Sequence, residues 1–295
     1  MIKAKEIASK SPEEIVELLD GIYEHSEWVA QELARKENLT SMETVTALAL
    51  AMKSIVDGAS HERKLELLCN HPDLCERADK IKELTKESQE EQSKSGLQLL
   101  TDKEQDTFQK HNTAYRSKFG FPFILAVRNS TKFTVLAGLS GRLANRLEKE
   151  VNIALEQVHK IAWMRLLAMI NTDDAKGFLT CHVLDTANGL GANKMRIHLQ
   201  RLSPPEFAGF IGEYFTNSEG RLEKGPALNG GKEFKVGVYE WTFFVGDYFA
   251  SMGMFTAGTQ FLDTIPLRFG IDNPDDHYHV PLLVSPWSYS TYRGS

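Results

Sequence analysis

Apolar residues in positions 1–170 recur at the three- and four-residue spacing of helices. The segment Ser11-Pro12-Glu13-Glu14 predicts a helix start, because it holds a capping serine, a first-turn proline and a capping-box glutamate. A second helix is expected from near Ser41 to Val56, and a third from Thr101 to about Phe119. The longest apolar stripe predicts one buried helix from Ser140 to Leu166, so this half of the chain is predicted to be all-helical.

The pattern changes after residues 171–177, a polar and turn-rich stretch that we predict to be a linker. Phe178 to Asp185 is a compact run of β-type residues, and Met195 to Leu199 alternates apolar and polar residues. Phe234 to Phe249 is rich in Val, Tyr, Trp and Phe, which favour strands. Because Gly and Pro interrupt this half at short intervals, residues 178–295 are predicted to form an antiparallel β-sandwich.

Length and composition fit a fusion of two unlike domains. The 295 residues suit two cores, and no internal repeat relates the all-α domain over residues 1–170 to the all-β domain over residues 178–295. The net charge of -6 disfavours a nucleic-acid scaffold, and no apolar stretch reaches the roughly 18 residues of a membrane span. Three cysteines make no disulfide framework, and neither end carries a secretion or peroxisomal signal, so a cytoplasmic location is expected.

Three local patterns in the β-rich half carry residues suited to hydrolysis. Cys181-His182-Val183-Leu184-Asp185 lies on the opening strand, and the turn Thr216 to Arg221 delivers an arginine. The run from His277 to Pro286 is followed by the terminal Tyr292-Arg293-Gly294-Ser295. A histidine can take a proton from water near neutral pH, and an arginine can stabilise charge that develops on substrate oxygens. Together these groups could open a ring at a carbonyl without a covalent nucleophile.

In order, spacing and ending, these patterns resemble the transthyretin-like 5-hydroxyisourate hydrolases. The resemblance implies a transthyretin-like sandwich with His182, Arg221 and His279 as catalytic residues. It also implies a site at a subunit interface of a tetramer, lined by the tail residues Tyr292, Arg293, Gly294 and Ser295. One departure is Gly191, where the family commonly has proline; this is a turn position, so we expect it to affect loop rigidity rather than chemistry.

Each of these residues also has a plainer interpretation. A single histidine on a strand is usually structural, and Arg221 could simply cap a hairpin. His277 and His279 point to one strand face and could suit zinc, but no third spaced ligand is evident, so we expect no metal ion. For the whole chain, the alternative is a transthyretin-like protein that binds a small ligand and carries a helical interaction domain.

The helical half carries a second set of motifs. His71-Pro72-Asp73-Leu74 lies between two helices, where the proline restricts the histidine backbone to an extended form. Ser88-Gln89-Glu90-Glu91-Gln92 follows in a helical region, with its first, fourth and fifth residues on one face. The aromatic run from Lys118 to Val127 and Arg165, near the end of the long helix, complete the set. The adjacent glutamates could instead form a solvated helix face, and the phenylalanines could be ordinary core.

This set resembles the 2-oxo-4-hydroxy-4-carboxy-5-ureidoimidazoline (OHCU) decarboxylases, which are all-helical enzymes. The resemblance implies that His71 is the acid/base, Glu91 its partner carboxylate and Arg165 the anchor for the substrate. The substrate ring can hold the electrons left by decarboxylation, so no cofactor is expected. The implied pocket lining is Pro72, Ser88, Gln89, Glu90, Gln92, Phe123, Ile124, Leu125, Ala126 and Val127. A departure is Cys75-Glu76, where the family commonly has Ala-Gly or Gly-Gly.

The two resemblances support each other, because the product of the hydrolase family is the substrate of the decarboxylase family. We therefore expect a bifunctional enzyme of urate degradation that converts 5-hydroxyisourate to OHCU and then to (S)-allantoin. Its expected partners are these small purine-derived substrates and further copies of itself, forming a tetramer through the transthyretin-like domain with dimer contacts in the helical domain. Fusion raises the local concentration of the second site and does not by itself establish a tunnel.

Overall fold

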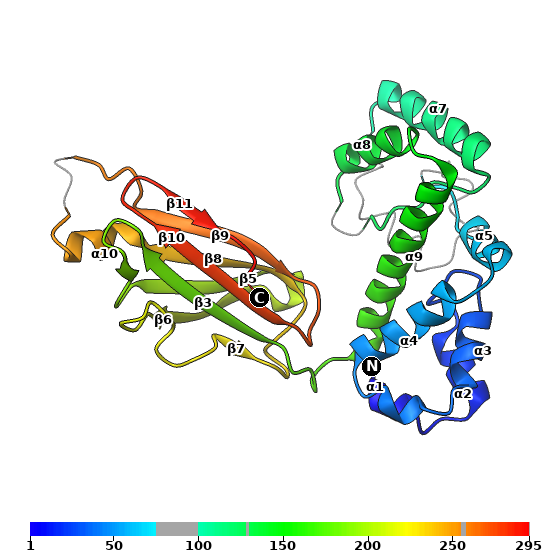
Figure 1. Ribbon diagram of the computed structural model, residues 1–295, viewed down its shortest axis with the longest axis horizontal. Helices are drawn as coiled ribbons and strands as arrows, with labels where there is room; N and C mark the ends of the chain where they lie inside the picture. The colour runs from blue at the N-terminus through cyan, green and yellow to red at the C-terminus, as the bar shows by residue number, and fades with distance from the viewer. Residues whose placement is uncertain (75–99, 128–129, 255–257, 295) are drawn as a thin grey trace. The chain divides into compact units, whose positions relative to one another are not determined.

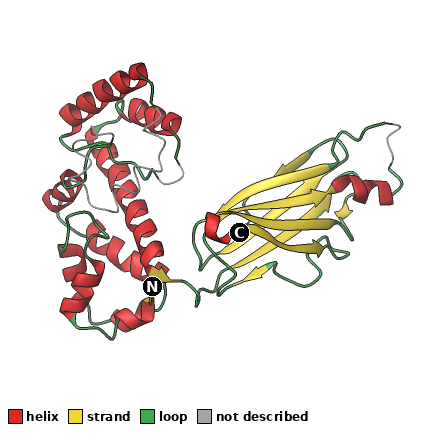
Figure 2. Cartoon of the chain, turned by 180° about the vertical axis from the view of Figure 1, so that it is seen from behind, coloured by secondary structure: helices red, strands yellow, loops and turns green. Residues whose placement is uncertain are grey.

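The computed structural model describes residues 1–74, 100–127, 130–254 and 258–294. The chain divides into two compact units, Met1–Asn171 (unit 1) and Thr172–Ser295 (unit 2). Unit 1 is built from helices and unit 2 mainly from strands (Figure 2), which confirms the predicted fold class. In the part of the chain that the structure describes, no helix is long and apolar enough to cross a membrane.

Unit 1 is organised along one long helix. Its helical segments are α1 (Ala4–Ile7), α2 (Pro12–Leu19), α3 (Trp28–Ala34), the 3-10 turn η1 (Leu39–Ser41), α4 (Val45–Asp57), α5 (His61–Cys69), α7 (Asp102–Phe119), α8 (Lys132–Arg142) and α9 (Leu147–Met169). In Figure 1, α7 and α8 lie toward the N-terminal end of α9, and α1 to α4 lie toward its C-terminal end. Strands β1 (Ile2–Lys3) and β2 (Ile170–Asn171) pair in parallel and join the start of the chain to the end of α9.

The predicted capping residues begin two of these helices. Ser11 accepts a hydrogen bond from the Glu14 backbone at 3.2 Å, and the Glu14 carboxylate accepts one from the Ser11 backbone at 2.8 Å. Thr101 and Glu104 form the same reciprocal pair at the start of α7. The second helix begins later than predicted, because Thr44 rather than Ser41 caps α4. Each cap satisfies backbone N–H groups that a helix start leaves without partners.

The prediction of one long helix from Ser140 is wrong at its N-terminal end. Ser140 belongs to α8, and α9 begins at Leu147. In the turn between them, the Lys118 ammonium donates to the carbonyls of Leu143 and Asn145 at 2.7 and 2.9 Å. A side chain from α7 thus occupies carbonyls that a continuous helix would use. The apolar spacing runs through this turn, so periodicity alone did not reveal it.

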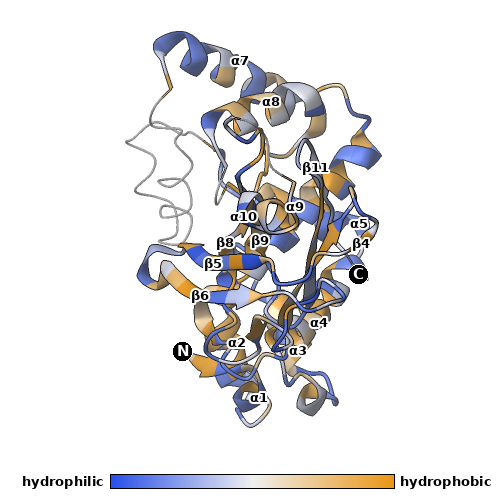
Figure 3. Ribbon diagram, turned by 90° about the vertical axis from the view of Figure 1, so that its left-hand side faces the viewer, coloured by the Kyte–Doolittle hydropathy of each residue, from blue (hydrophilic) through white to orange (hydrophobic). Residues whose placement is uncertain are grey.

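The apolar stripe of α9 forms the centre of the core of unit 1. Val151, Leu155, Val158, Ala162 and Leu166 are all buried on this helix. Burying a valine or leucine side chain stabilises the fold by about 1.5–3 kcal/mol. Helix α7 is coloured mostly as hydrophilic in Figure 3, and it contributes only a narrow buried face to the same core.

Unit 2 consists of two sheets with a shared core. Its elements are β3 (Phe178–Asp185), β4 (Leu190–Gly191), β5 (Arg196–Ser203), the 3-10 turn η4 (Pro205–Phe207), β6 (Gly209–Phe215), β7 (Leu228–Asn229), β8 (Gly237–Phe244), α10 (Val245–Ser251), β9 (Thr264–Ile271), β10 (His277–Val284) and β11 (Tyr289–Thr291). One sheet has the order β11-β10-β3-β4 with β7 paired to β3, and the other has the order β6-β5-β8-β9. Leu179 and Cys181 from the first sheet and Trp241 and Phe243 from the second lie in one buried cluster.

Two details of unit 2 differ from the predicted sandwich. Strands β3 and β10 pair in parallel, whereas the sequence suggested a wholly antiparallel fold. A parallel pair needs a long crossover, and here the rest of the unit provides it. The apolar run that ends at Phe249 is also not all strand: from Val245 it forms helix α10, whose Tyr248 hydroxyl donates to Asp185 at 3.0 Å.

Residues 171–177, predicted to be a linker, are anchored at both ends. Asn171 belongs to the β1–β2 pair of unit 1. On the side of unit 2, the Lys235 ammonium lies 2.6 Å from the Asp173 carboxylate, and the Ala175 carbonyl accepts a hydrogen bond from the Gly231 backbone at 3.0 Å. Contacts to both folded units therefore hold the two ends of this stretch.

Candidate active sites

His71 follows the C-terminal end of α5 and is 7% exposed. The preceding residue, Asn70, donates its side-chain amide to the carbonyl of His25 at 3.1 Å, which anchors the chain beside the histidine. The Nε2 atom of His71 is buried and has no hydrogen-bond partner among the described residues. Because an unpaired buried polar atom costs free energy, the ring presents an unused hydrogen-bonding group to whatever enters here.

Arg165 lies on α9, and its guanidinium is paired inside unit 1. Its Nη2 atom lies 2.6 Å from the Glu24 carboxylate, and its Nη1 atom donates to the Gly21 carbonyl at 2.7 Å. Glu24 is 1% exposed, so this is a buried ion pair. Both partners come from the segment between α2 and α3, and they fix the guanidinium in one orientation.

The environment of His71 keeps its imidazole neutral. Burial lowers the pKa of His71 from 6.5 to about 4. The carboxylate of Glu24 opposes this lowering of the pKa, whereas the positive charges of Arg165 and His25 add to it. At neutral pH the ring therefore carries a lone pair, and an arriving anion would raise its proton affinity.

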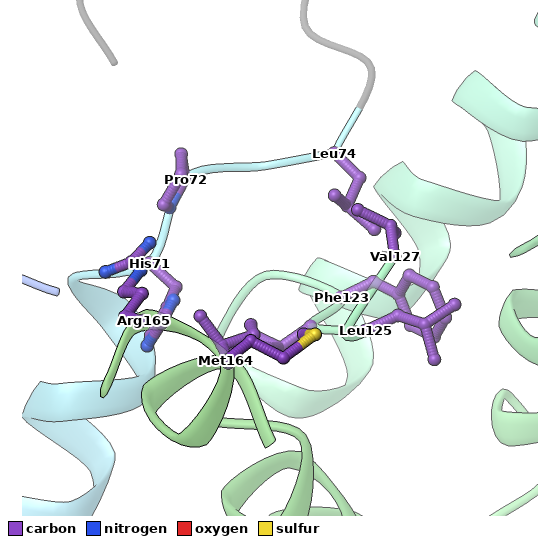
Figure 4. A pocket seen from close by; sticks show the side chains of 10 residues that line it. His71, Pro72, Leu74, Phe123, Leu125, Val127, Met164 and Arg165 are labelled. Atoms are coloured by element: carbon purple, nitrogen blue, oxygen red, sulfur yellow. The ribbon is translucent and has the colours of Figure 1, made fainter. Parts of the chain in front are cut away.

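His71 and Arg165 form one side of a mainly apolar pocket. In Figure 4 they lie opposite Leu74 and Val127, with Met164 between the two sides. A pocket with one histidine, one arginine and apolar walls suits a small anionic ring. Its lining consists of His71, Pro72, Leu74, Phe123, Ile124, Leu125, Val127, Ile161, Met164 and Arg165.

The wall made by Phe123–Val127 has no regular secondary structure, and side chains hold it in place. The Arg142 guanidinium donates to the Ile124 carbonyl at 2.7 Å, and the Gln157 side chain accepts from the Ala126 backbone at 3.2 Å. Ala126 thus serves as a backbone anchor and is not one of the pocket-lining residues, although its neighbours are. Side chains of α8 and α9 thus hold this wall of the pocket in position.

In unit 2, His182 and Arg221 lie beside each other in an antiparallel bridge. The Nε2 atom of His182 lies 2.7 Å from the carbonyl oxygen of Glu219. A carbonyl only accepts, so Nε2 carries the proton, and in the neutral ring Nδ1 keeps the lone pair. The Glu219 backbone therefore selects the tautomer of His182.

The turn that delivers Arg221 is tightly built. The side-chain oxygen of Asn217 accepts hydrogen bonds from the Glu219 and Arg221 backbones, both at 3.0 Å. Gly220 has φ of 80°, and a Cβ there would overlap the Val183 carbonyl of β3. Only glycine combines this backbone angle with so close an approach, which places Arg221 against the strand that carries His182.

Gly191, the departure at the β4 turn, also touches this site. A Cβ at Gly191 would overlap the backbone of Glu219, the residue whose carbonyl accepts from His182. The expectation that Gly191 affects only loop rigidity is therefore too narrow. Because Gly191 has no side chain, the Glu219 backbone can pack closely against it, and the carbonyl of Glu219 orients the predicted catalytic His182.

His279 and His277 share one hydroxyl group. The Thr180 hydroxyl lies 2.8 Å from Nδ1 of His279 and 2.7 Å from Nε2 of His277. The His277 ring stacks on Phe178, with ring centres 4.1 Å apart. Burial lowers the pKa of His279, and the charges of Arg221, His277 and His182 lower it further, so His279 is predominantly neutral at neutral pH.

The tail packs against β10 through Gly294. The Gly294 backbone donates to the His279 carbonyl at 3.0 Å, and a Cβ at Gly294 would overlap the His279 ring. Arg293 instead stacks over Tyr278, 4.8 Å from the ring centre, and its neighbour Tyr292 is exposed. Of these tail residues, Gly294 therefore makes the contact with a predicted catalytic side chain.

The family model described as OHCU decarboxylase matches residues 8–167, and the model of the HIUase/Transthyretin family matches residues 179–294. A 5-hydroxyisourate hydrolase 2 from Rhizobium meliloti is 50% identical over 119 residues, which are 40% of this chain and 97% of that protein. The chain belongs to the OHCU decarboxylase family and, through unit 2, to the HIUase/Transthyretin family.

Two further similarities cover more of the chain. A 2-oxo-4-hydroxy-4-carboxy-5-ureidoimidazoline decarboxylase from Halalkalicoccus jeotgali is 38% identical over 165 residues, which are 56% of this chain and 90% of that protein. A crystal structure of an (S)-allantoin synthase is 61% identical, covers both chains completely and has a TM-score of 0.89. The similarity to that structure spans both family regions at once.

In the decarboxylase-family unit, the structure brings together most of the predicted residues that it describes. His71, Pro72 and Arg165 line one pocket with Phe123, Ile124, Leu125 and Val127. The predicted Ser88, Gln89, Glu90, Glu91 and Gln92 lie outside the described residues, as does the Cys75-Glu76 departure. The role of Glu91 as partner carboxylate therefore stays a prediction.

In the hydrolase-family unit, His182, Arg221 and His279 gather on adjacent segments. The ring centres of His182 and His279 are 6.4 Å apart, and Gly294 closes one side of His279. Ser295 lies outside the described residues. Within the described ranges, no group of three His, Cys, Asp or Glu side chains is placed to hold a metal ion.

Sequence reasoning missed several residues that shape the sites, among them Ile161, Glu24 and Thr180. Ile161 lines the pocket four positions before Arg165, and helical spacing could have identified it. Glu24 carried no local signal, because its partner Arg165 lies far along the chain. Thr180 lies two positions before His182 on the same strand face, so strand alternation placed it there but did not reveal its contacts with two histidines.

Proposed function

We propose that this chain catalyses two successive steps of urate degradation. Unit 2 hydrolyses 5-hydroxyisourate to OHCU, and unit 1 decarboxylates OHCU to (S)-allantoin. The observation that carries the proposal is the presence of both families on one chain, aligned over their full extent with an (S)-allantoin synthase. The candidate site of each unit is consistent with the step assigned to it.

The hydrolytic step uses His279, Arg221 and His182 of unit 2. His279, whose pKa is lowered, takes a proton from a water molecule while the water oxygen bonds to the carbonyl carbon of the substrate. Arg221 stabilises the negative charge that develops on the carbonyl oxygen. The ring C–N bond then breaks, and the leaving nitrogen receives the proton that His279 took from the water. His182, whose tautomer is selected by the Glu219 carbonyl, orients the water or substrate through Nδ1.

The decarboxylation step uses the pocket of unit 1. Arg165 pairs with the anionic substrate, whose charge raises the proton affinity of the neutral His71. The bond between the ring carbon and the carboxylate breaks, carbon dioxide leaves, and the electron pair remains on the substrate ring. The enol left behind takes a proton from water at its ring nitrogen and gives its hydroxyl proton to the neutral His71, so that the carbonyl of the product forms. His71 returns that proton to the neighbouring ring carbon, which bears the ureido group, from one side of the pocket, and this sets the (S) configuration.

One experiment tests both steps. 5-Hydroxyisourate is generated from urate in situ, and its ultraviolet absorbance and the circular dichroism of the product are followed with and without the protein. We expect faster decay of the absorbance and an optically active product, because spontaneous decay yields a racemate. An unchanged decay rate would contradict hydrolysis, and saturable ligand binding without faster decay would favour the transthyretin-like carrier.

The assembly proposed for the chain follows from the same families. We propose a homo-oligomer, specifically a tetramer through unit 2 with dimer contacts in unit 1. The support is the family membership of unit 2 and the outward position of Tyr289 and Tyr292, which are 49% and 58% exposed near the edge strand β11. Light scattering of the full chain measures the assembly directly, and a monomer at working concentration would contradict it.

A further inference from the structure

Thr180 connects two histidines of unit 2 through a single hydroxyl group. Its oxygen lies 2.7 Å from Nε2 of His277 and 2.8 Å from Nδ1 of His279. Thr180 and His182 lie on the same face of β3, and the register pairs Thr180 with His279 on β10. The backbone pairing of the central strands β3 and β10 therefore holds Thr180, His182 and His279 in place, and no loop is involved.

The number of protons on the Thr180 hydroxyl limits how it can hydrogen-bond to His277 and His279. A threonine hydroxyl has one proton to donate and two acceptor positions. Of its two close contacts with ring nitrogens, at most one uses the hydroxyl proton, so at least one histidine must donate an N–H to Thr180. The hydroxyl also has the Tyr278 carbonyl at 3.5 Å as another acceptor. Thr180 therefore constrains the tautomer of one or both histidines.

We propose that Thr180 is a positioning residue for the hydrolase step, which accepts the Nδ1 proton of His279 and leaves the Nε2 lone pair free to act as the base. In the same arrangement Thr180 donates its own proton to Nε2 of His277. The inference rests on the proposed hydrolase function, because that function gives His279 the role of base.

Three features of the surroundings support this direction. The Cβ position of Gly294 lies nearest Cδ2 of His279, so the tail packs against the side of the ring that faces away from the contact between Nδ1 and Thr180. The His277 ring is fixed by its stack on Phe178, which holds its Nε2 toward Thr180. The groups that act on the charge of His279 are Arg221, His277 and His182, all cationic when protonated, and they favour its neutral form. A neutral ring has two tautomers, and the hydroxyl selects between them.

The test replaces the hydroxyl without changing the side-chain shape. In Thr180→Val, Nδ1 of His279 loses its acceptor, and the ring is expected to return to the Nε2–H tautomer that free histidine favours. We expect kcat for 5-hydroxyisourate hydrolysis to fall about 10- to 100-fold, with KM little changed. This is less than the roughly 100- to 10,000-fold loss expected when a general base is removed, because His279 itself is still present. Thr180→Ser keeps the hydroxyl and should restore most of kcat. Thr242→Val, at another half-buried strand threonine, serves as the matched control.

Nitrogen-15 NMR of the full, histidine-labelled chain reports the tautomer directly, with the His279 signal assigned by its loss in His279→Asn. We expect Nδ1–H in the wild type and in Thr180→Ser, and Nε2–H in Thr180→Val. An Nε2–H tautomer in the wild type, or an unchanged kcat in Thr180→Val, would overturn the inference. Near-ultraviolet circular dichroism of the buried aromatic residues of unit 2, Trp241 among them, shows that this unit is folded in the same variants. Failure of the wild type to hydrolyse 5-hydroxyisourate would instead refute the proposed function, while the tautomer still reports on Thr180.

Discussion

At the scale of single residues, charge pairing decides what the pocket of unit 1 can do. The Arg165 guanidinium is held by Glu24 and the Gly21 carbonyl, and these contacts leave it beside His71. Glu24 has two effects: it fixes the arginine, and it opposes the lowering of the pKa of His71 by burial. Glu24 is thus a positioning residue that influences both predicted catalytic groups without lining the pocket.

Glu24→Gln removes one charge and keeps the side-chain size. We expect decarboxylase kcat/KM to fall about 10- to 100-fold, as is typical when a supporting partner of a functional group is lost. Without the carboxylate, the pKa of His71 falls further below its present value near 4, so the acid limb of the pH–rate profile moves to lower pH. Breaking the buried pair should also destabilise unit 1 by about 3–5 kcal/mol.

Steady-state kinetics across pH and urea unfolding measure these effects. Glu17→Gln, at an exposed position of neighbouring α2, is the matched control. Unchanged decarboxylation in Glu24→Gln, together with an unmoved acid limb, would show that Arg165 and His71 do not depend on this carboxylate.

At the scale of elements, each site depends on a short segment packed onto a regular one. The turn Asn217–Arg221 lies against β3, and the Phe123–Val127 wall is held by side chains of α8 and α9. In the first case the close approach depends on Gly220, which has no Cβ to meet the Val183 carbonyl. Rigid strands and helices thereby give loop residues the precision that catalysis needs.

Gly220→Ala should disturb the turn that carries Arg221. The alanine meets the Val183 carbonyl and adopts a left-handed backbone, so the turn must shift. A displacement of about 1 Å can lower a rate 100-fold, and we expect a loss of that order in hydrolase kcat/KM. Decarboxylation should be unchanged, because the turn belongs to unit 2.

Gly225→Ala is the control, since Gly225 has a similar φ of 83° but nothing within 4 Å of its Cβ position. It separates the strain of a left-handed backbone from the effect of the overlap. Equal losses in the two variants would mean that backbone strain, and not the contact with β3, governs the activity.

At the scale of the whole molecule, the chain carries two sites with separate cores. Each unit has its own buried cluster, one around α9 and one between the two sheets. The two proposed steps are consecutive, so their fusion keeps the second site at a raised local concentration near the first product. Separate cores also mean that a substitution in one site serves as an internal control for the other.

His71→Ala should separate the two activities. Ring opening should keep its wild-type rate, because His71 lies in unit 1, whereas stereoselective formation of (S)-allantoin should be lost. Loss of a general acid/base lowers the decarboxylation rate about 100- to 10,000-fold, so spontaneous racemic decay then dominates. Ultraviolet absorbance and circular dichroism measure the two steps in one sample. Optical activity that persists in His71→Ala would exclude the proposed role, and His182→Ala provides the reciprocal variant.

The sequence by itself determined what depends on neighbours along the chain. Helical spacing, strand alternation and the caps at Ser11 and Thr101 act over a few residues, and they identified the two fold classes. The motifs around His71, His182 and His279 were likewise readable, because each presents its chemistry within a short segment. The apolar stripe of α9 could be predicted as well, but the residue at which α9 begins could not. The turn that separates α8 from α9 is capped by Lys118, which comes from α7.

Only the tertiary structure decided which distant residues meet. Thr180 and His277 are 97 positions apart and become neighbours because β3 and β10 pair in parallel. Glu24 reaches Arg165 across the core of unit 1, and no local pattern marks either partner for the other. Hydrogen bonds and ion pairs act over a few ångströms in space, whereas sequence patterns record only separation along the chain. The protonation and orientation of the predicted catalytic groups therefore emerge from the packing of segments that the chain order keeps far apart.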